Sequence, residues 1–374
     1  MAAKAFEARL QRVREAMARS STDVLLLSLG ADLPWLTGYW AMPLERLTML
    51  VVPPGSCGEV PTLVVPALEA PRVEVLPEVF TIRAWGESED PVALVSAIVR
   101  RCAPGAPTVA VSDRAWATFL LQLQAQLPRA RWQPASGVMA PLRAVKDVAE
   151  VEALGLAAAA ADRVTAALLA GDIPLLGRRE RDISAEISRR LVAEGHDKVN
   201  FAIVASGPNA ASPHHEAGDR IVQPGEPVVC DFGGSLAGYC SDTTRTVFAG
   251  PPAPDLAHIY DVVAEAQAAG VAAAKVGVPC SDVDKTVRDI IAEAGLGDLF
   301  VHRTGHGIGL EEHEEPYLVA GNQALVQAGH VFSVEPGVYV PGRWGVRIED
   351  IVAATPEGPL PLNRADHALT VVRT

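Results

Sequence analysis

The sequence is short of cysteine, of positive charge and of long apolar runs, and each shortage excludes a class of protein. Its five cysteines are widely spread and form no Cys-X-X-Cys pair, so we expect reduced thiols in a cytoplasmic protein rather than a disulfide framework. No segment has about 18 uninterrupted apolar residues, so we expect no transmembrane helix. The formal net charge of −13 argues against a nucleic-acid partner or an anionic membrane surface.

The chain has the composition of a soluble globular protein, with 374 residues of which 49% are hydrophobic and 21% charged. Residues 1–130 alternate short apolar runs with helical patterns, which predicts an α/β domain. Residues 131–146 contain proline and glycine and are predicted to be a linker. The elements expected before the linker are strands at Val24–Leu29, Leu47–Val52 and Pro61–Pro66 and helices at Ala93–Arg101 and Ala115–Leu127.

Residues 147–374 have a different pattern, in which two pairs of helices alternate with strand-and-turn segments. This order predicts an α+β domain with helices on one face of a curved antiparallel sheet. The expected helices are Asp147–Ala170, Arg178–Glu194, Asp255–Lys275 and Ser281–Ala294.

Two carboxylates lie in the segment VVCDFGGSLAGYCSDTTRTV. Asp231 ends an apolar run, and Asp242 stands at the start of the next expected strand. Gly-Gly and a further glycine between them allow a tight return, so we expect the two side chains to face each other across a hairpin. The ordinary alternative is that an Asp beside Gly-Gly is only a turn residue.

Three more candidate ligands follow. His306 lies within a glycine cluster, in HRTGHGIGLEEHEEP, where it is harder to explain as an ordinary core histidine. Glu335 ends the apolar run of VFSVEPGVYV, and burying it is costly unless it is paired or bound to metal. In GVRIEDIV the alternation of a strand places Arg347 and Glu349 on the same face. An edge-strand ion pair is the alternative for these two.

Together these five candidates, Asp231, Asp242, His306, Glu335 and Glu349, are four carboxylates and one imidazole. Carboxylates brought close together repel each other at neutral pH without a cation between them. Oxygen ligands with one nitrogen suit divalent Mn, Co, Zn or Fe better than a metal that prefers thiolates. We therefore predict a site for two divalent ions, with manganese first and cobalt or zinc as alternatives.

The ordered set of ligands resembles the metallopeptidases of the pita-bread fold, which include prolidases, aminopeptidase P and methionine aminopeptidase. The resemblance extends over most of residues 147–374. The segment DLPWLTGY (Asp32–Tyr39) resembles the creatinase-type N-terminal domain, which methionine aminopeptidases generally lack. The resemblance implies a pita-bread catalytic domain behind a smaller α/β creatinase-like domain, and a homodimer.

The resemblance also implies roles for individual residues. Asp242 and Glu349 would bridge the two ions, with Asp231 completing one and His306 and Glu335 the other. In such sites the ions lie about 3.5–4 Å apart and activate a shared water. Glu335 would take the proton of that water, and two histidines would stabilise the tetrahedral intermediate. These are His214, in GPNAASPHHEAGDR, and His313, in EEHEEP.

The implied activity is hydrolysis of Xaa-Pro dipeptides that carry a trans-proline at the C-terminal position. An Xaa-Pro aminopeptidase acting on longer peptides shares the same motif residues, and a non-catalytic binding module is the alternative from another class. A dipeptidase must recognise a carboxylate, which suits arginine. Arg347 and Arg46 are the candidates for this contact, and Tyr239 is a candidate for lining the pocket. The plain alternatives are a solvated Arg46 and a packing role for Tyr239.

Overall fold

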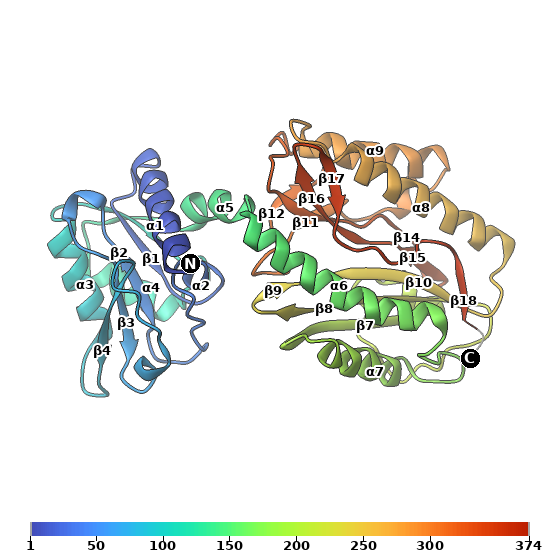
Figure 1. The fold of residues 1–374 in the computed structure, drawn as a ribbon, viewed down its shortest axis with the longest axis horizontal. Coiled ribbons are helices and arrows are strands. Elements are labelled where there is room, and N and C mark those ends of the chain that lie inside the picture. Colours follow the sequence, from blue (N-terminus) through green and yellow to red (C-terminus); the bar gives the residue numbers. More distant parts are fainter. Residues whose placement is uncertain (1, 373–374) are drawn as a thin grey trace. The chain divides into compact units, whose positions relative to one another are not determined.

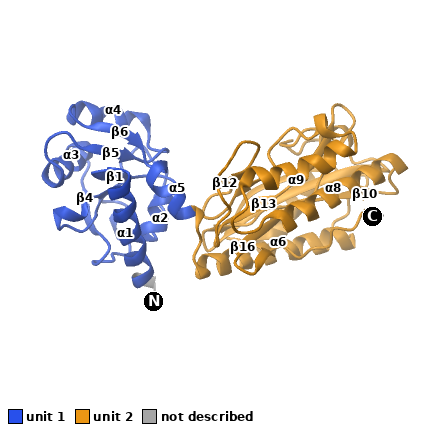
Figure 2. Ribbon diagram, turned by 90° about the horizontal axis from the view of Figure 1, so that it is seen from above, with its two compact units in different colours: residues 1–143 blue, residues 144–374 orange. Residues whose placement is uncertain are grey.

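The computed structural model describes residues 2–372, and the chain divides into two compact units, residues 1–143 and 144–374 (Figure 2). The first unit is α/β and the second is α+β, so the predicted fold class is confirmed.

The first unit is built on a mixed sheet with the strand order β4-β3-β2-β1-β5-β6. Its central strand β1 is fully buried, as its four consecutive apolar residues require. Asp90 caps helix α3 by accepting hydrogen bonds from the amides of Val92 and Ala93. The elements of this unit are α1 (Ala2–Arg19), β1 (Val24–Leu27), α2 (Asp32–Thr37), β2 (Met49–Val52), η1 (Gly55–Cys57), β3 (Thr62–Pro66), η2 (Ala70–Arg72), β4 (Thr81–Trp85), α3 (Pro91–Cys102), β5 (Thr108–Val111), α4 (Ala117–Gln126), β6 (Arg131–Pro134) and α5 (Ser136–Ala144).

The predicted linker at 131–146 was wrong for most of its length. Its residues form edge strand β6, which pairs in parallel with β5, and helix α5. An interior proline such as Pro141 costs a helix about 3 kcal/mol. Helix α5 buries Val138, Met139 and Leu142, and each such side chain contributes up to about 1.5–3 kcal/mol. Tertiary packing therefore outweighs the local signal, and the unit boundary falls after Arg143.

The second unit contains two main sheets, with the orders β18-β10-β8-β7 and β12-β11-β13-β16-β17, and the hairpin β14-β15. Helices α6 and α7 share a core with the first of these sheets, and α8 and α9 share cores with the second and with the hairpin (Figure 1). The elements are α6 (Val148–Ala170), α7 (Glu180–Ala193), β7 (Lys198–Ser206), η3 (Gly207–Ala211), β8 (Glu226–Leu236), β9 (Tyr239–Cys240), β10 (Thr243–Ala249), α8 (Pro254–Ala273), α9 (Cys280–Glu293), η4 (Gly297–Leu299), β11 (Gly305–Gly307), β12 (Glu314–Leu318), β13 (Val331–Val334), β14 (Gly337–Val340), β15 (Trp344–Arg347), β16 (Asp350–Thr355), β17 (Gly358–Pro361) and β18 (Thr370–Val372).

Helix α6 is the one helix within residues 2–372 that is long and apolar enough to cross a membrane. Its start is set by a capping box, in which Asp147 and Glu150 each accept from the other's backbone amide. Its buried residues, among them Ala161, Val164 and Leu168, join strands β7, β8 and β10 in one core. This is the position of a core helix, which meets the same length and composition test.

Candidate metal centre

The five predicted ligands come from segments distributed across both sheets of the second unit, and the fold brings their side chains together. Asp231 lies within β8, Asp242 between β9 and β10, His306 at the centre of β11, Glu335 directly after β13 and Glu349 between β15 and β16. Ligand atoms of Asp242, His306 and Glu349 lie within 4.8 Å of one another, and all three residues are buried.

The remaining two candidates adjoin this group. The Nε2 atom of His306 lies 3.2 Å from Oε1 of Glu335 and 3.7 Å from Oδ2 of Asp242. Asp231 raises the pKa of both Asp242 and Glu349 electrostatically, in addition to the larger effect of their burial. The facing partner of Asp231 across the β8–β10 pair is Thr244 rather than Asp242, which lies one residue before β10 begins.

The backbone orients His306. Its Nδ1 lies 3.1 Å from the carbonyl oxygen of Gly307; a carbonyl can only accept, so this contact requires the proton on Nδ1. The ring therefore turns Nε2 toward the carboxylates, the arrangement of a metal-binding imidazole. Glycine is needed on both sides, since a Cβ on Gly305 would stand 1.9 Å from the backbone oxygen of Ser333, and one on Gly307 would stand 2.2 Å from that of Glu315.

The centre gathers four carboxylates, and this excess of negative charge fits a bound cation. Burial, followed by the nearby carboxylates, raises the pKa of Asp242 and Glu349 well above the usual range. Oδ1 of Asp231 and Oε1 of Glu349 are buried among the described residues without a hydrogen-bond partner. Such atoms are costly unless they bind something. The donor set of hard oxygens and one imidazole fits divalent ions such as Mn²⁺.

The structure gives Arg347 a different surrounding from the predicted substrate contact. Its Nη2 donates to Asp231 Oδ2 at 2.6 Å, its Nη1 to the Tyr339 hydroxyl at 2.8 Å and its Nε to the Thr244 hydroxyl at 3.1 Å. Arg347 is only 3% exposed. The guanidinium is therefore engaged by the protein and orients Asp231. The Tyr339 hydroxyl in turn lies 2.9 Å from Nε2 of His302.

The residues around Glu349 escaped the sequence analysis. Thr244 donates its hydroxyl to Glu349 Oε2 at 2.7 Å, and the Glu349 amide donates to the Thr244 carbonyl. Buried Arg245 donates to the Glu349 carbonyl at 2.7 Å and pairs with Asp350 at 2.8 Å. The one local signal for Thr244 is strand alternation in SDTTRT, which places Thr244 on the same face as Asp242. Arg347 and Glu349 both contact its hydroxyl, as their predicted common face requires.

The two predicted substrate histidines have different surroundings. The His313 ring lies 4.1 Å from the His306 ring, centroid to centroid. Desolvation, with smaller contributions from His306, Arg303 and His214, lowers the pKa of His313 to about 4. His214 is exposed, on the loop after η3.

Glu180, which the sequence analysis also missed, holds that loop. Its side chain is fully buried and accepts hydrogen bonds from the amide and hydroxyl of Ser206, the Asn209 amide group and the backbone amide of Gly218, with Nε2 of His215 a further 2.8 Å partner. Burial raises the pKa of Glu180, but the hydrogen bonds outweigh it and hold that pKa below the usual range. A glutamate on a helix shows no local pattern that distinguishes it from a solvated one.

The two remaining predicted contacts have partners elsewhere. The Tyr239 hydroxyl donates to Glu150 on α6 at 3.0 Å, and its ring packs against a core cluster. Arg46, in the first unit, forms ion pairs with Glu45 and Glu87 at 2.5 and 3.0 Å, and about a third of its side chain is exposed. These arrangements match the plain alternatives for both residues, and their substrate contacts stay predictions.

Comparison with known proteins matches both units. Residues 9–145 match the Creatinase/Prolidase N-terminal domain, and residues 150–356 match Metallopeptidase family M24. The chain is 43% identical to "Probable dipeptidase PepE" of Mycobacterium tuberculosis, over 100% of this chain and 99% of that protein. It is 35% identical to "Xaa-Pro dipeptidase" of Lactobacillus helveticus, covering 97% and 98%.

Among solved structures, the dipeptidase PepE from Mycobacterium ulcerans matches with a TM-score of 0.90 and 42% identity, over 100% of both chains. A creatinase-type domain followed by a pita-bread unit with a buried carboxylate and imidazole centre defines a peptidase of the metal-dependent class. The chain belongs to metallopeptidase family M24.

Proposed function

We propose that this protein is a dipeptidase that uses two divalent ions to hydrolyse the peptide bond before a C-terminal trans-proline. The observation that supports it most is the convergence of Asp242, His306 and Glu349 within 4.8 Å, with Glu335 adjoining. The unpartnered buried oxygens of Asp231 and Glu349 add to this support. The Xaa-Pro dipeptidase of L. helveticus, 35% identical along nearly the whole chain, supports the substrate class.

In this proposal the two ions would be held by Asp231, Asp242, His306, Glu335 and Glu349, with Asp242 and Glu349 as the ligands that both ions would share. When bound, the ions supply a Lewis acid and lower the pKa of a water molecule. Burial raises the pKa of Glu335, but nearby His306 outweighs it and brings that pKa to about 2. Its carboxylate is therefore charged at neutral pH in the metal-free protein. In the proposed reaction Glu335 would take a proton from the attacking water and pass it to the proline nitrogen as the bond breaks.

The substrate carbonyl is the proposed partner of the two histidines. His313 lies against His306 and is neutral at pH 7, since its pKa is about 4. A neutral imidazole still donates one N–H, which can stabilise the oxygen on which negative charge develops. His214 would act from the loop that Glu180 organises, and it contributes to the lowered pKa of His313. In this proposal Arg347 does not contact the substrate. It positions Asp231 by donating a hydrogen bond to its carboxylate.

Recognition of the free carboxylate distinguishes a dipeptidase from an Xaa-Pro aminopeptidase. The Arg347 guanidinium already donates to four protein groups, the fourth being the Pro213 carbonyl, so Arg46 is the remaining candidate from the sequence. Its contribution from the partner subunit of a homodimer is part of the proposal. Manganese as the native ion and a cytoplasmic location are its other parts. Metal analysis of protein purified without added metal and sedimentation of the dimer test the ion and the assembly.

The decisive experiment measures hydrolysis of Met-Pro, Met-Ala and Met-Pro-Gly by protein loaded with Mn²⁺. Cleavage of Met-Pro alone is expected. Efficient release of Pro-Gly from the tripeptide would instead identify an aminopeptidase, and equal cleavage of Met-Ala would remove the proline requirement. Glu349→Gln serves as the inactive control, because it removes a charged bridging ligand without changing side-chain shape. An Arg46→Ala variant with unchanged KM for Met-Pro would remove Arg46 from the site.

A further inference from the structure

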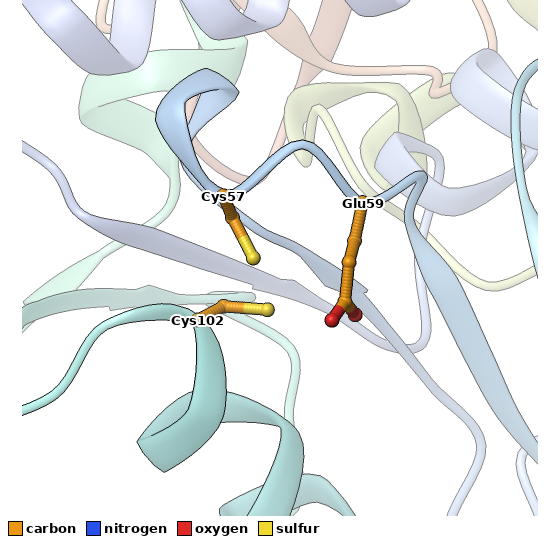
Figure 3. A group of neighbouring side chains, drawn as sticks. All are labelled: Cys57, Glu59 and Cys102. Carbon is orange, nitrogen blue, oxygen red and sulfur yellow. The ribbon is translucent and has the colours of Figure 1, made fainter.

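The first unit contains a second group of metal-type ligands, which the peptidase chemistry does not use. Cys57 ends the short η1 helix, Glu59 follows two residues later and Cys102 ends helix α3. Their two sulfur atoms and a carboxylate oxygen all lie within 4.8 Å of one another. Figure 3 shows the three side chains converging, two from the η1 segment and one from the end of α3.

The chemistry of this group differs from that of the peptidase centre. Two sulfur ligands and one oxygen select soft or borderline ions such as Zn²⁺ and Cd²⁺, whereas Mn²⁺ prefers oxygen. Cys102 is buried, and Cys57 and Glu59 are half-buried. An ion can therefore enter from the side of the η1 segment, and water can supply the fourth ligand of a tetrahedral site.

Arg101 provides the support that a ligating carboxylate needs. Its Nε donates to Glu59 Oε1 at 2.8 Å and its Nη2 to Oε2 at 2.6 Å. A carboxylate has about four lone-pair positions, so this two-point contact leaves positions open for an ion while fixing the plane of the group. Arg14 fixes the same residue by donating to the Glu59 carbonyl at 2.9 Å.

The charges at this group balance when an ion is present. Each thiol releases its proton on binding, so two thiolates and the Glu59 carboxylate carry three negative charges. A divalent cation and the Arg101 guanidinium carry three positive charges. The occupied site is therefore neutral, which reduces the cost of placing it beside the apolar core that Cys102 joins.

We propose that Cys57, Glu59 and Cys102 form a binding site for a soft divalent cation of the zinc class. The ion connects the η1 segment to the C-terminal end of α3 and thereby stabilises the first unit. This site is independent of the peptidase centre in both ligands and metal preference.

The test uses the full-length protein, freed of metal with a chelator and then kept in excess Mn²⁺ so that the carboxylate centre is occupied. Cd²⁺ is added under reducing conditions, and the ultraviolet sulfur-to-cadmium charge-transfer band is recorded. Carboxylates and imidazole do not produce this band, so the signal reports thiolate binding alone. We expect one equivalent of Cd²⁺ to produce it and Zn²⁺ to displace it.

Variants assign the signal to residues. Cys57→Ser and Cys102→Ser should each abolish tight Cd²⁺ binding, while Cys280→Ser, at a buried thiol in the second unit, should leave it unchanged. Arg101→Gln should weaken it by about 10- to 100-fold, as the loss of a supporting partner does. Thermal unfolding verifies that each variant folds, and Cys57→Ser, at a half-buried position, keeps the test available if Cys102→Ser does not.

Two results would overturn the proposal. The first is the absence of a charge-transfer band in the wild-type protein, and the second is a band that persists in both Cys57→Ser and Cys102→Ser. In the first case a mild oxidant shows what the pair does instead. Loss of two thiols on treatment with glutathione disulfide would mean that the pair forms a disulfide and binds no ion.

Discussion

Arg347 donates a hydrogen bond of 2.6 Å to Asp231, and both side chains are almost completely buried. The same guanidinium contacts Tyr339 and Thr244, and Thr244 holds Glu349. Two of the proposed metal ligands are thus connected through one arginine and one threonine. The orientation of these ligands depends on residues that would not touch the metal themselves.

Replacing Arg347 should expose this dependence. In metal-free protein Arg347→Ala leaves the buried Asp231 charge without its partner, which costs about 3–5 kcal/mol of unfolding free energy. Arg347→Lys keeps the charge but cannot reach Asp231, Tyr339 and Thr244 together, so it should lose less stability but still lower kcat. Urea unfolding and Met-Pro hydrolysis measure the two effects. Arg343→Ala, an exposed position with a distant Trp344 contact, should cost under about 1 kcal/mol.

Metal removal should destabilise the wild-type protein much more than Glu349→Gln. The pKa of Glu349 is raised in the folded, metal-free state. The protein therefore loses stability as pH rises from the ordinary glutamate pKa through the folded-state pKa. At pH 8 metal-free Glu349→Gln should be at least as stable as wild type. Mn²⁺ at 100 times its Kd should stabilise wild type by about 2.7 kcal/mol and the variant by much less.

These shifts are measured by thermal unfolding with and without Mn²⁺. Equal stabilisation of wild type and Glu349→Gln would mean that Mn²⁺ binds elsewhere.

Glu180→Gln should disturb the loop that carries His214. An amide presents an N–H₂ group toward donors that now face a carboxylate oxygen, and a hydrogen bond to a charged group is worth about 1.5–3 kcal/mol. We expect a loss of that order in unfolding free energy and a higher KM for Met-Pro. Glu186→Gln on the same helix, which loses only half-exposed ion pairs, should change stability by less than about 1 kcal/mol. An unchanged KM for Met-Pro in Glu180→Gln would show that this loop does not contribute to substrate binding.

His330 should make the protein less stable in mild acid. Burial, followed by the nearby Lys146 charge, lowers the pKa of His330 to about 4, and its Nδ1 accepts a hydrogen bond from the Gln327 amide at 3.2 Å. Its contribution to stability is present above the unfolded pKa of about 6.5 and is lost as pH falls toward 4, by about 3 kcal/mol in all.

His330→Gln should therefore reduce the loss of stability between pH 6.5 and pH 4, measured by urea unfolding across that range. His258→Gln, at an exposed position on α8, should leave the loss unchanged. A pH dependence that is the same in His330→Gln as in wild type would contradict the assignment.

Much of the fold could be predicted because the spacing of apolar residues along the sequence agreed with the packing in the structure. The helix expected at Asp147–Ala170 is observed at Val148–Ala170 with Asp147 as its cap. The pattern failed where packing opposed it, as in α5, which keeps Pro141 inside a helix. The prediction that Asp231 and Asp242 face each other also failed in detail, because the strand pairing offsets them by two residues. Turn residues indicate that a hairpin returns, but not its register.

The sequence by itself determined which chemistry the chain can perform. Carboxylates that follow apolar runs are costly to bury without a cation, and these runs and the glycines around His306 are readable from local pattern alone. Only the tertiary structure decided what supports that chemistry. Arg347 contacts Asp231 across 116 positions of chain and Thr244 contacts Glu349 across 105. No local pattern specifies such pairs, because the sheets that bring them together form only when the whole core packs.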